Sequence, residues 1–96
     1  MLHKLVQKHH PFVVLRGNTY YFRYALPLHL RKLGPTLPAE VKRSLSTDSF
    51  TEAVSMVGAK FPLIKLLRRC QDASVIQSLL GRLVDFSAQL KDWVDE

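Results

Sequence analysis

The segment Val13-Val14-Leu15-Arg16-Gly17-Asn18-Thr19-Tyr20-Tyr21-Phe22-Arg23-Tyr24 predicts a β-hairpin, and this hairpin decides the fold of the chain. Its flanks are rich in β-branched and aromatic residues, which favour a pleated, half-buried surface. Gly17-Asn18 is the expected turn, because glycine accepts the positive φ that the first central position of a type II′ turn requires. A two-residue turn pairs the strands as follows: Arg16 with Thr19, Leu15 with Tyr20, Val14 with Tyr21, Val13 with Phe22 and Phe12 with Arg23.

Alternation of side chains divides this hairpin into an apolar face and a mixed face. The apolar face, which needs a packing partner, holds Val13, Leu15, Tyr20, Phe22 and Tyr24. The mixed face holds Phe12, Val14, Arg16, Thr19, Tyr21, Arg23 and Ala25. Arginines, hydroxyls and an aromatic ring on one face are suited to phosphates and base edges, although a merely solvated outer face has the same composition.

A third strand is predicted at residues 40–46, Glu-Val-Lys-Arg-Ser-Leu-Ser. Lys42 and Ser44 have the parity that extends the mixed face. Arg43 shares the parity of the apolar residues on either side of it, so either a bulge shifts the register or Arg43 lies at an edge. Before this strand, residues 28–33 predict one or two helical turns that end at Gly34-Pro35.

Helices are predicted after the sheet. Ser49-Phe50-Thr51-Glu52 matches the capping box, in which a hydroxyl is followed three residues later by a carboxylate. Pro62 predicts a kink or break between about Lys60 and Leu63, because proline lacks the N–H for an internal helix bond. The stripe that covers the apolar face of the sheet consists of Phe50, Ala53, Val54, Val57, Phe61 and Ile64.

A last helix is predicted from a cap at Asp72 or Ser74 nearly to Glu96. Its apolar stripe, with a spacing near 3.5 residues, consists of Ile76, Leu79, Leu80, Leu83, Phe86, Leu90, Trp93 and Val94. This spacing is typical of a helix that packs along another helix. We expect an intramolecular hairpin with residues 50–69; the alternative is docking of residues 75–94 on a second chain or on a further domain.

The predicted fold class is therefore α+β: a small three-stranded antiparallel β-sheet backed by a helix, followed by a C-terminal helical hairpin or linker helix. Residues 1–10 are expected to form a flexible basic arm, residues 11–70 the sheet and its helix, and residues 71–96 the C-terminal helix. We also expect the chain to be part of a longer protein, since it ends in an apolar helix.

The distribution of charge favours a polyanionic partner. The chain has 96 residues, with 14 lysines and arginines against 8 acidic residues. Residues 1–46 contain eight basic residues and one acidic residue, whereas residues 47–96 contain six and seven. A basic half that includes the predicted sheet, beside a near-neutral helical half, indicates a surface for nucleic acid on the sheet.

Several other classes are excluded or disfavoured. The single Cys70 rules out an intramolecular disulfide framework and a cysteine-based zinc site. His3, His9 and His10 lack an acidic or cysteine ligand nearby, so we expect no metal and no cofactor. No apolar run reaches the roughly 18–20 residues that cross a bilayer, and there is no signal peptide, which favours a cytoplasmic protein without membrane contact.

The ordered set Thr19-Tyr20-Tyr21-Phe22-Arg23, Leu26-Pro27, Leu30-Arg31, Val41-Lys42-Arg43-Ser44-Leu45-Ser46-Thr47 and Glu52-Ala53 resembles the N-terminal segment of phage-type tyrosine recombinases, the site-specific integrases. The resemblance covers about residues 12–61. It implies a three-stranded sheet backed by a helix, similar to arm-type DNA-binding domains that lay the sheet in a groove of double-stranded DNA. A helical core-binding domain, whose start residues 71–96 would form, and a catalytic domain normally follow.

The expected DNA-binding residues combine the mixed face, the turn and the third strand: Arg16, Asn18, Thr19, Tyr21, Arg23, Lys42, Arg43 and Ser44. We expect no catalysis by this chain, since its tyrosines lie on a strand without a base, a metal cluster or a glycine-rich phosphate loop. Two alternatives stay open: a protein-interaction or oligomerisation module acting through the C-terminal leucine-rich helix, and a free-standing small nucleic-acid-binding regulator.

Overall fold

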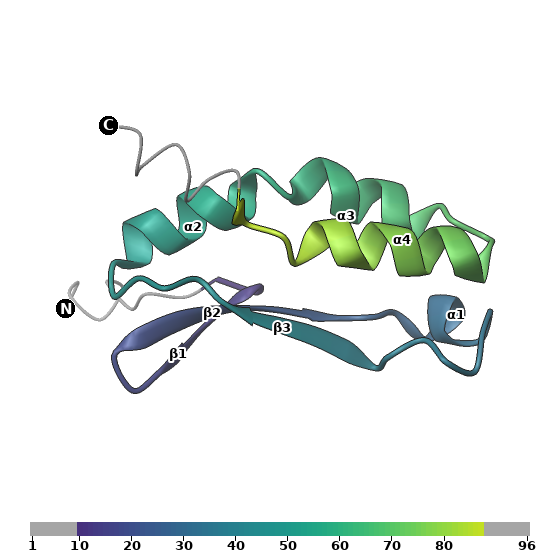
Figure 1. Cartoon of the computed structure of the whole chain (residues 1–96), viewed down its shortest axis with the longest axis horizontal. Helices are drawn as coiled ribbons and strands as arrows, with labels where there is room; N and C mark the ends of the chain where they lie inside the picture. The colour runs from purple at the N-terminus through teal and green to yellow at the C-terminus, as the bar shows by residue number, and fades with distance from the viewer. Residues whose placement is uncertain (1–9, 88–96) are drawn as a thin grey trace, which may run out of the picture.

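The structure, a computed structural model, describes residues 10–87 as two layers, a β-sheet and a layer of helices (Figure 1). The elements in chain order are β1 (Val13–Arg16), β2 (Thr19–Ala25), α1 (Leu28–Arg31), β3 (Glu40–Ser44), α2 (Phe50–Gly58), α3 (Phe61–Arg68) and α4 (Ala73–Leu83). The sheet is antiparallel with the order β1-β2-β3. Helices α2, α3 and α4 lie along one face of it and leave the other uncovered, which confirms the α+β prediction (Figure 1).

The hairpin has the predicted register, from Arg16 opposite Thr19 to Val13 opposite Phe22. Gly17 has a φ of 63°. Among the described residues other than glycine, positive φ occurs at Ser46 alone, so Asn18 keeps a negative φ as the second position of a type II′ turn requires. The ordinary chemistry of a two-residue turn therefore sets the register of the sheet.

Two hairpin residues lie differently from the prediction. Phe12 accepts a hydrogen bond from the backbone N–H of its predicted partner Arg23 (3.0 Å), but it precedes β1 in a tight turn of residues 10–13, and its side chain does not lie on the mixed face. Its ring packs on the helical side, with its centre 5.7 Å from that of Tyr24. Leu15, expected in the core, is 53% exposed although its cross-strand partner Tyr20 is only 7% exposed. The helical layer covers the central strand but stops short of this end of the edge strand.

The pairing of β3 with β2 determines on which side of the sheet Arg43 lies. The pairs run without interruption from Ala25 opposite Glu40 to Tyr21 opposite Ser44, so no bulge shifts the register before the end of β3. Arg43 stands opposite Phe22 and therefore on the helix-covered side, where it stays exposed because β3 is an edge strand. The irregular step comes later, at Ser46, whose φ is 55°.

The start of α2 uses the predicted capping residues together with Thr47. The Ser49 hydroxyl accepts a hydrogen bond from the backbone N–H of Glu52 (3.2 Å). The Glu52 carboxylate does not return to Ser49 directly: it accepts a bond from the Thr47 hydroxyl (2.6 Å), and that oxygen accepts one from the Ser49 N–H (3.0 Å). A buried threonine thus completes the capping box and ties α2 to the end of the sheet.

The helical run breaks at Ala59 and Lys60, next to the predicted position, and Pro62 lies in the first turn of α3, where a missing N–H costs nothing. Lys60 is only 8% exposed. Its ammonium donates to the backbone oxygens of Arg82 (3.0 Å), in the last turn of α4, and of Asp85 (2.5 Å), just after that helix. Burial lowers the pKa of Lys60, and the charge of Asp85 opposes that effect.

Helix α4 begins at Asp72, one of the two predicted caps: its carboxylate accepts a hydrogen bond from the backbone N–H of Ser74 (2.8 Å). It ends at Leu83, so the prediction of one helix nearly to Glu96 is wrong as far as residue 87. It packs beside α3 as a helical hairpin, as expected. The part of the predicted stripe at residues 90–94, and the basic arm except for His10, lie outside the described residues.

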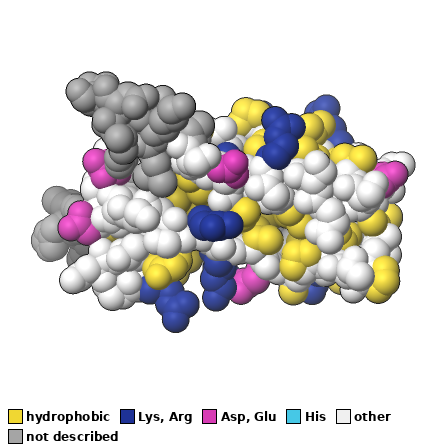
Figure 2. All heavy atoms as spheres, viewed as in Figure 1, with side chains coloured by type: hydrophobic (Ala, Val, Ile, Leu, Met, Phe, Trp, Pro, Cys, Tyr) yellow, Lys and Arg dark blue, Asp and Glu magenta, His cyan; other side chains and the backbone are white. Residues whose placement is uncertain are grey.

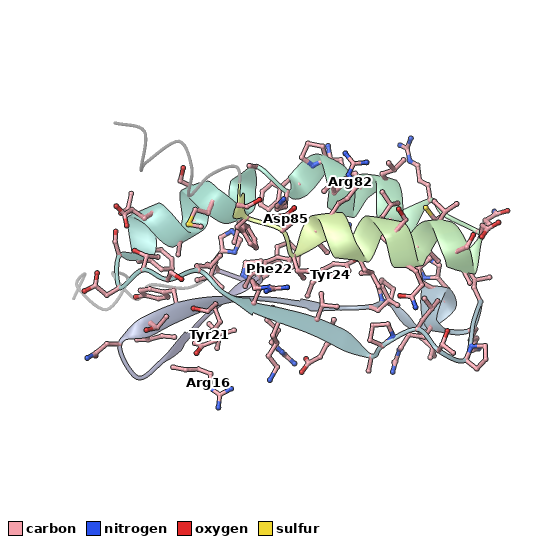
Figure 3. The ribbon with its side chains drawn as sticks, viewed as in Figure 1. Arg16, Tyr21, Phe22, Tyr24, Arg82 and Asp85 are labelled. Carbon is pink, nitrogen blue, oxygen red and sulfur yellow. The ribbon has the colours of Figure 1, made fainter. Side chains whose placement is uncertain are left out.

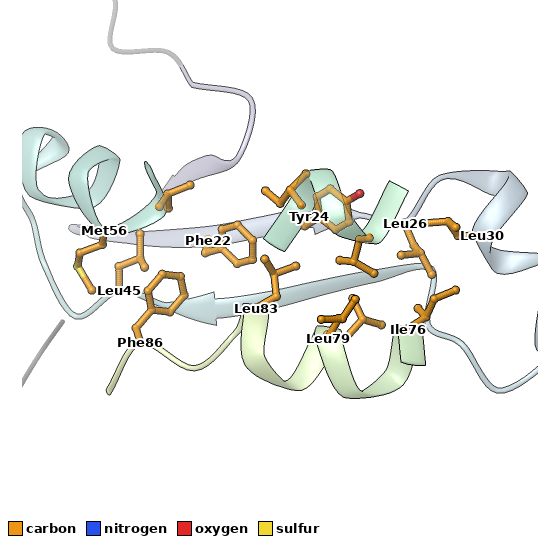
Figure 4. Close-up of a cluster of buried hydrophobic side chains, with 14 of the residues drawn as sticks. Phe22, Tyr24, Leu26, Leu30, Leu45, Met56, Ile76, Leu79, Leu83 and Phe86 are labelled. Atoms are coloured by element: carbon orange, nitrogen blue, oxygen red, sulfur yellow. The ribbon is translucent and has the colours of Figure 1, made fainter. Parts of the chain in front are cut away.

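One core joins the sheet to all the larger helices (Figure 4). The ring centres of Phe22, on the central strand, and Phe86, after α4, lie 5.6 Å apart. The residues that are at most 1% exposed are Phe22, Leu30, Leu45, Ala53, Val57, Leu67, Ile76 and Leu83. Since α4 contributes to this core, the boundary predicted at residues 70 and 71 does not separate two cores. No helix within residues 10–87 is long and apolar enough to cross a membrane.

Candidate nucleic-acid interface

The uncovered face of the sheet is the candidate site, and it is called the open face below. Arg16 and Tyr21 point away from the helices, whereas Phe22 and Tyr24 point toward them (Figure 3). The two strand pairings place nine residues on this side: Val14, Arg16, Thr19, Tyr21, Arg23, Ala25, Glu40, Lys42 and Ser44. Residues from three separate segments of the chain thus form one surface.

Cross-strand pairing gathers the charges of this face. Arg23 stands opposite Lys42. The Glu40 carboxylate lies between them, with its Oε1 2.7 Å from Arg23 Nε and its Oε2 3.6 Å from Lys42 Nζ. The hydrogen bond from Arg23, reinforced by the charges of both cations, holds the pKa of the Glu40 carboxyl below its ordinary value. With Arg16, the open face carries three cations and one carboxylate, and its net charge is positive.

The bond to Glu40 leaves much of the Arg23 guanidinium available. It engages Nε, and the side chain of Arg23 remains half exposed. A guanidinium held at Nε keeps its terminal amino groups to donate to a phosphate or to the O6 and N7 atoms of guanine. Arg23 is therefore a cation held in place by its neighbour.

Six of the eight predicted binding residues lie together on the open face: Arg16, Thr19, Tyr21, Arg23, Lys42 and Ser44. The Ser44 hydroxyl accepts a hydrogen bond from the backbone N–H of Ser46 (3.1 Å), so it also supports the irregular step after β3. Asn18 is exposed in the hairpin turn, at one end of this face.

Arg43 is separated from the open face. Together with Asp85, Phe86 and Ser87 it lines a shallow hollow between β3 and the end of α4. Hydrogen bonds from Ser87 hold the pKa of Asp85 below its ordinary value, and the positive charges of Lys60 and Arg43 add to this effect. The prediction of Arg43 within the interface is corrected: its parity places it on the opposite side of the sheet.

Glu40 is a charged residue of this face that is not among the predicted binding residues. Nothing in the sequence alone registers the third strand against the second, so its contact with Arg23 was not foreseen. The available signal was its parity, because Glu40 shares the face of Lys42 two residues later. Within residues 10–87 no cluster of histidine, cysteine and acidic residues could hold a metal ion.

Most residues of the recombinase-like pattern form the fold. Leu26, Leu30, Leu45 and Ala53 are buried in the core. The Thr47 hydroxyl and the Glu52 carboxylate complete the cap of α2. Of its exposed members, Arg23, Lys42 and Arg43 lie on strands of the sheet, and the others lie on α1, on α2 or after β3. The pattern is therefore mainly a signature of this architecture.

A family model described as "Domain of unknown function (DUF6538)" matches residues 12–60, half of the chain, and the chain belongs to this family. The match runs from the start of the hairpin to the end of α2, and it contains every residue of the open face. No curated protein and no solved structure matches the chain.

Proposed function

We propose that this chain is a DNA-binding module of a phage-type tyrosine recombinase and that it anchors the enzyme on duplex DNA for site-specific recombination. The observation that carries the DNA-binding part is the open face, a surface that helices α2, α3 and α4 leave uncovered and on which three cations, hydroxyls and Tyr21 converge. The recombinase part rests on the sequence resemblance. The chain itself acts by binding and has no catalytic role.

The proposed complex places the sheet in the major groove, which is wide enough for a β-ribbon. Arg16, near the hairpin turn, and Lys42, on the edge strand, contact phosphates and set the position of the sheet. Arg23 lies on the central strand, where the sheet would approach the base edges most closely, and Glu40 limits its conformational freedom. Arg23 is therefore the residue assigned to base recognition.

The test is a titration of duplex DNA with the full chain at several salt concentrations. Each neutralised phosphate contributes about −0.9 to the slope of log K against log salt, so contacts with a few phosphates give a slope of roughly −3 to −5. Arg16→Ala and Lys42→Ala are expected to weaken binding and to flatten that slope. Arg82→Ala is the matched control, because Arg82 is exposed on the helical layer (Figure 3). Absence of binding at low salt, or equal losses in all three variants, contradicts the proposal.

Sequence preference tests the recombinase part separately. Selection from a pool of random duplexes is expected to enrich one sequence, as an anchor for site-specific recombination requires. Arg23→Ala is expected to relax the preference at one or two base pairs, each worth about 1–3 kcal/mol of discrimination. Binding without any enriched sequence would retain the DNA-binding proposal and remove its recombinase part.

A further inference from the structure

The outer face of α3 is a second exposed surface, on the layer opposite the open face. Its members are Phe61, Pro62, Lys65, Leu66, Arg68 and Arg69. The helix already packs on the core through Ile64 and Leu67. Phe61 and Leu66 nevertheless remain 41% and 51% exposed. Hydrophobic and basic side chains lie next to one another over the helical layer (Figure 2).

Two hollows give this outer face its shape. The first has a volume of about 180 Å³ and is lined by Phe12, Phe61, Ile64, Lys65 and Arg68. The second has a volume of about 280 Å³ and is lined by Pro62, Lys65, Leu66 and Arg69. The ring centre of Phe61 lies 6.1 Å from that of Phe12 and 6.1 Å from that of His10. Packed rings therefore form one wall of the first hollow, and the surface is preorganised for a ligand.

The charge of the outer face has a single sign. Lys65, Arg68 and Arg69 are its ionic groups, and the sequence contains no acidic residue from position 61 to position 71. None of the three cations forms an ion pair with a residue in the range 10–87. Each hollow thus has apolar walls with a cation at its rim, which is complementary to a ligand that carries both apolar side chains and carboxylates.

This combination disfavours three other occupants. A second copy that used the same face would bring three cations against three. A nucleic-acid backbone would engage the cations but would bury little of Leu66. A bilayer surface requires a broad apolar helix face, whereas α3 turns Ile64 and Leu67 toward the core. A protein segment that alternates apolar and acidic faces satisfies both features of the surface at once.

We propose that the outer face of α3 binds an acidic amphipathic helix of a partner protein. Apolar side chains of that helix, spaced three or four residues apart, enter the two hollows beside Phe61 and Leu66. Carboxylates on its flanks pair with Lys65, Arg68 and Arg69. This inference does not depend on the proposed DNA binding, which uses the opposite layer.

The probe is a synthetic helical peptide with leucine at every third or fourth position and glutamate on both flanks. Titration into the full chain is expected to shift the amide NMR signals of α3 and to leave those of Arg16, Tyr21 and Arg23 unchanged. Two control peptides, one with alanine for leucine and one with lysine for glutamate, are expected to bind much more weakly. Binding that is equal for the three peptides, or shifts confined to residues outside α3 and its hollows, overturns the proposal.

Variants of the chain test the two halves of the surface. Leu66→Asp is expected to weaken binding of the acidic peptide about tenfold or more, with an unchanged circular dichroism spectrum. Leu15→Asp is the matched control, because Leu15 is 53% exposed at the far end of β1 and should leave binding unchanged. Lys65→Glu is expected to weaken binding severalfold, whereas Lys32→Glu, which changes a cation that lines neither hollow, is expected to have no effect.

Three further results overturn the proposal by assigning the face to another ligand. Displacement of the peptide by duplex DNA would make it a nucleic-acid contact. Equal shifts of the α3 signals with phosphatidylserine vesicles would make it a membrane contact. Shifts of the same signals on concentration of the chain alone would make it an interface between two copies.

Discussion

The two faces of the sheet are formed by the same strands, but different interactions determine which side chains each face carries. Phe22 and Arg23 are adjacent in β2: Phe22 is completely buried beneath the helices, whereas Arg23 is exposed beside Glu40. The covered face is constrained by packing, because its side chains meet a second layer. Among residues 10–87, the side chains of the open face contact their neighbours on the sheet and no second layer. Charge and hydroxyl groups therefore accumulate on the side of the sheet that the helices within residues 10–87 do not cover.

The largest expected effect is a loss of stability that differs between the covered face and the open face. Phe22→Ala is expected to lower the free energy of unfolding by about 3–5 kcal/mol, because it leaves a cavity between the sheet and α4. Tyr21→Ala, one residue away on the open face, is expected to cost about 1 kcal/mol or less and to weaken DNA binding. Urea denaturation of both variants measures the difference. Equal losses of stability would mean that the open face is also packed.

Substitution of Lys60 measures how much its buried ammonium contributes to the stability of the helical layer. Lys60→Met keeps the apolar stem but removes the ammonium from the backbone oxygens of Arg82 and Asp85. Leaving these acceptors without their donor is expected to lower the free energy of unfolding by about 1–3 kcal/mol. Lys65→Met, at an exposed position of α3, is the control for loss of a charge. A Lys60→Met variant as stable as its control would show that these hydrogen bonds add nothing.

Substitution of Thr47 measures how much its hydroxyl stabilises the junction between the sheet and α2. Thr47→Val preserves shape but removes the hydroxyl that joins the Glu52 carboxylate to the backbone N–H of Ser49. The expected cost is about 1 kcal/mol, as for other helix caps. Thr51→Val, at an exposed position of α2, provides the comparison. Thermal unfolding of both variants is the measurement, and a larger loss in Thr51→Val would contradict this role of Thr47.

The smallest expected effect is the pH dependence of the open face. The folded-state pKa of Glu40 lies below its ordinary value of 4.5, so the stabilisation from its ion pairs is complete above that value. It is lost as the pH falls through the lower, folded-state pKa. Titration of the Glu40 carboxyl by NMR is expected to show this lowered pKa, and Arg23→Ala should raise it toward 4.5. Arg16→Ala should leave it unchanged, and a rise in that variant would point to the general field of the face.

Local chemistry made several features predictable. The Gly17-Asn18 turn determined the hairpin register without any contact outside the hairpin. Ser49 and Asp72 marked two helix starts, because a short polar side chain satisfies the free N–H groups of a first turn wherever the helix lies. Six of the eight predicted interface residues followed from the same register and from parity along β3.

Other features depended on how the layers meet. Leu15 has the parity of the core, but only the extent of the helical layer decided that it is exposed. The end of α4 at Leu83 coincides with the capping of its last carbonyls by Lys60, a residue 22 positions earlier in a contact that no local pattern contains.

The sequence by itself determined the three strands, the hairpin register and the starts of α2 and α4, since each depends on interactions within a few residues. Only the tertiary structure decided the register of β3, the partnership of Glu40 with Arg23 and the exclusion of Arg43 from the open face. The physical reason is that these three features depend on contacts between distant parts of the chain, such as Arg23 and Glu40, which are 17 positions apart, and on the position of the helical layer. Both are outcomes of packing the whole core.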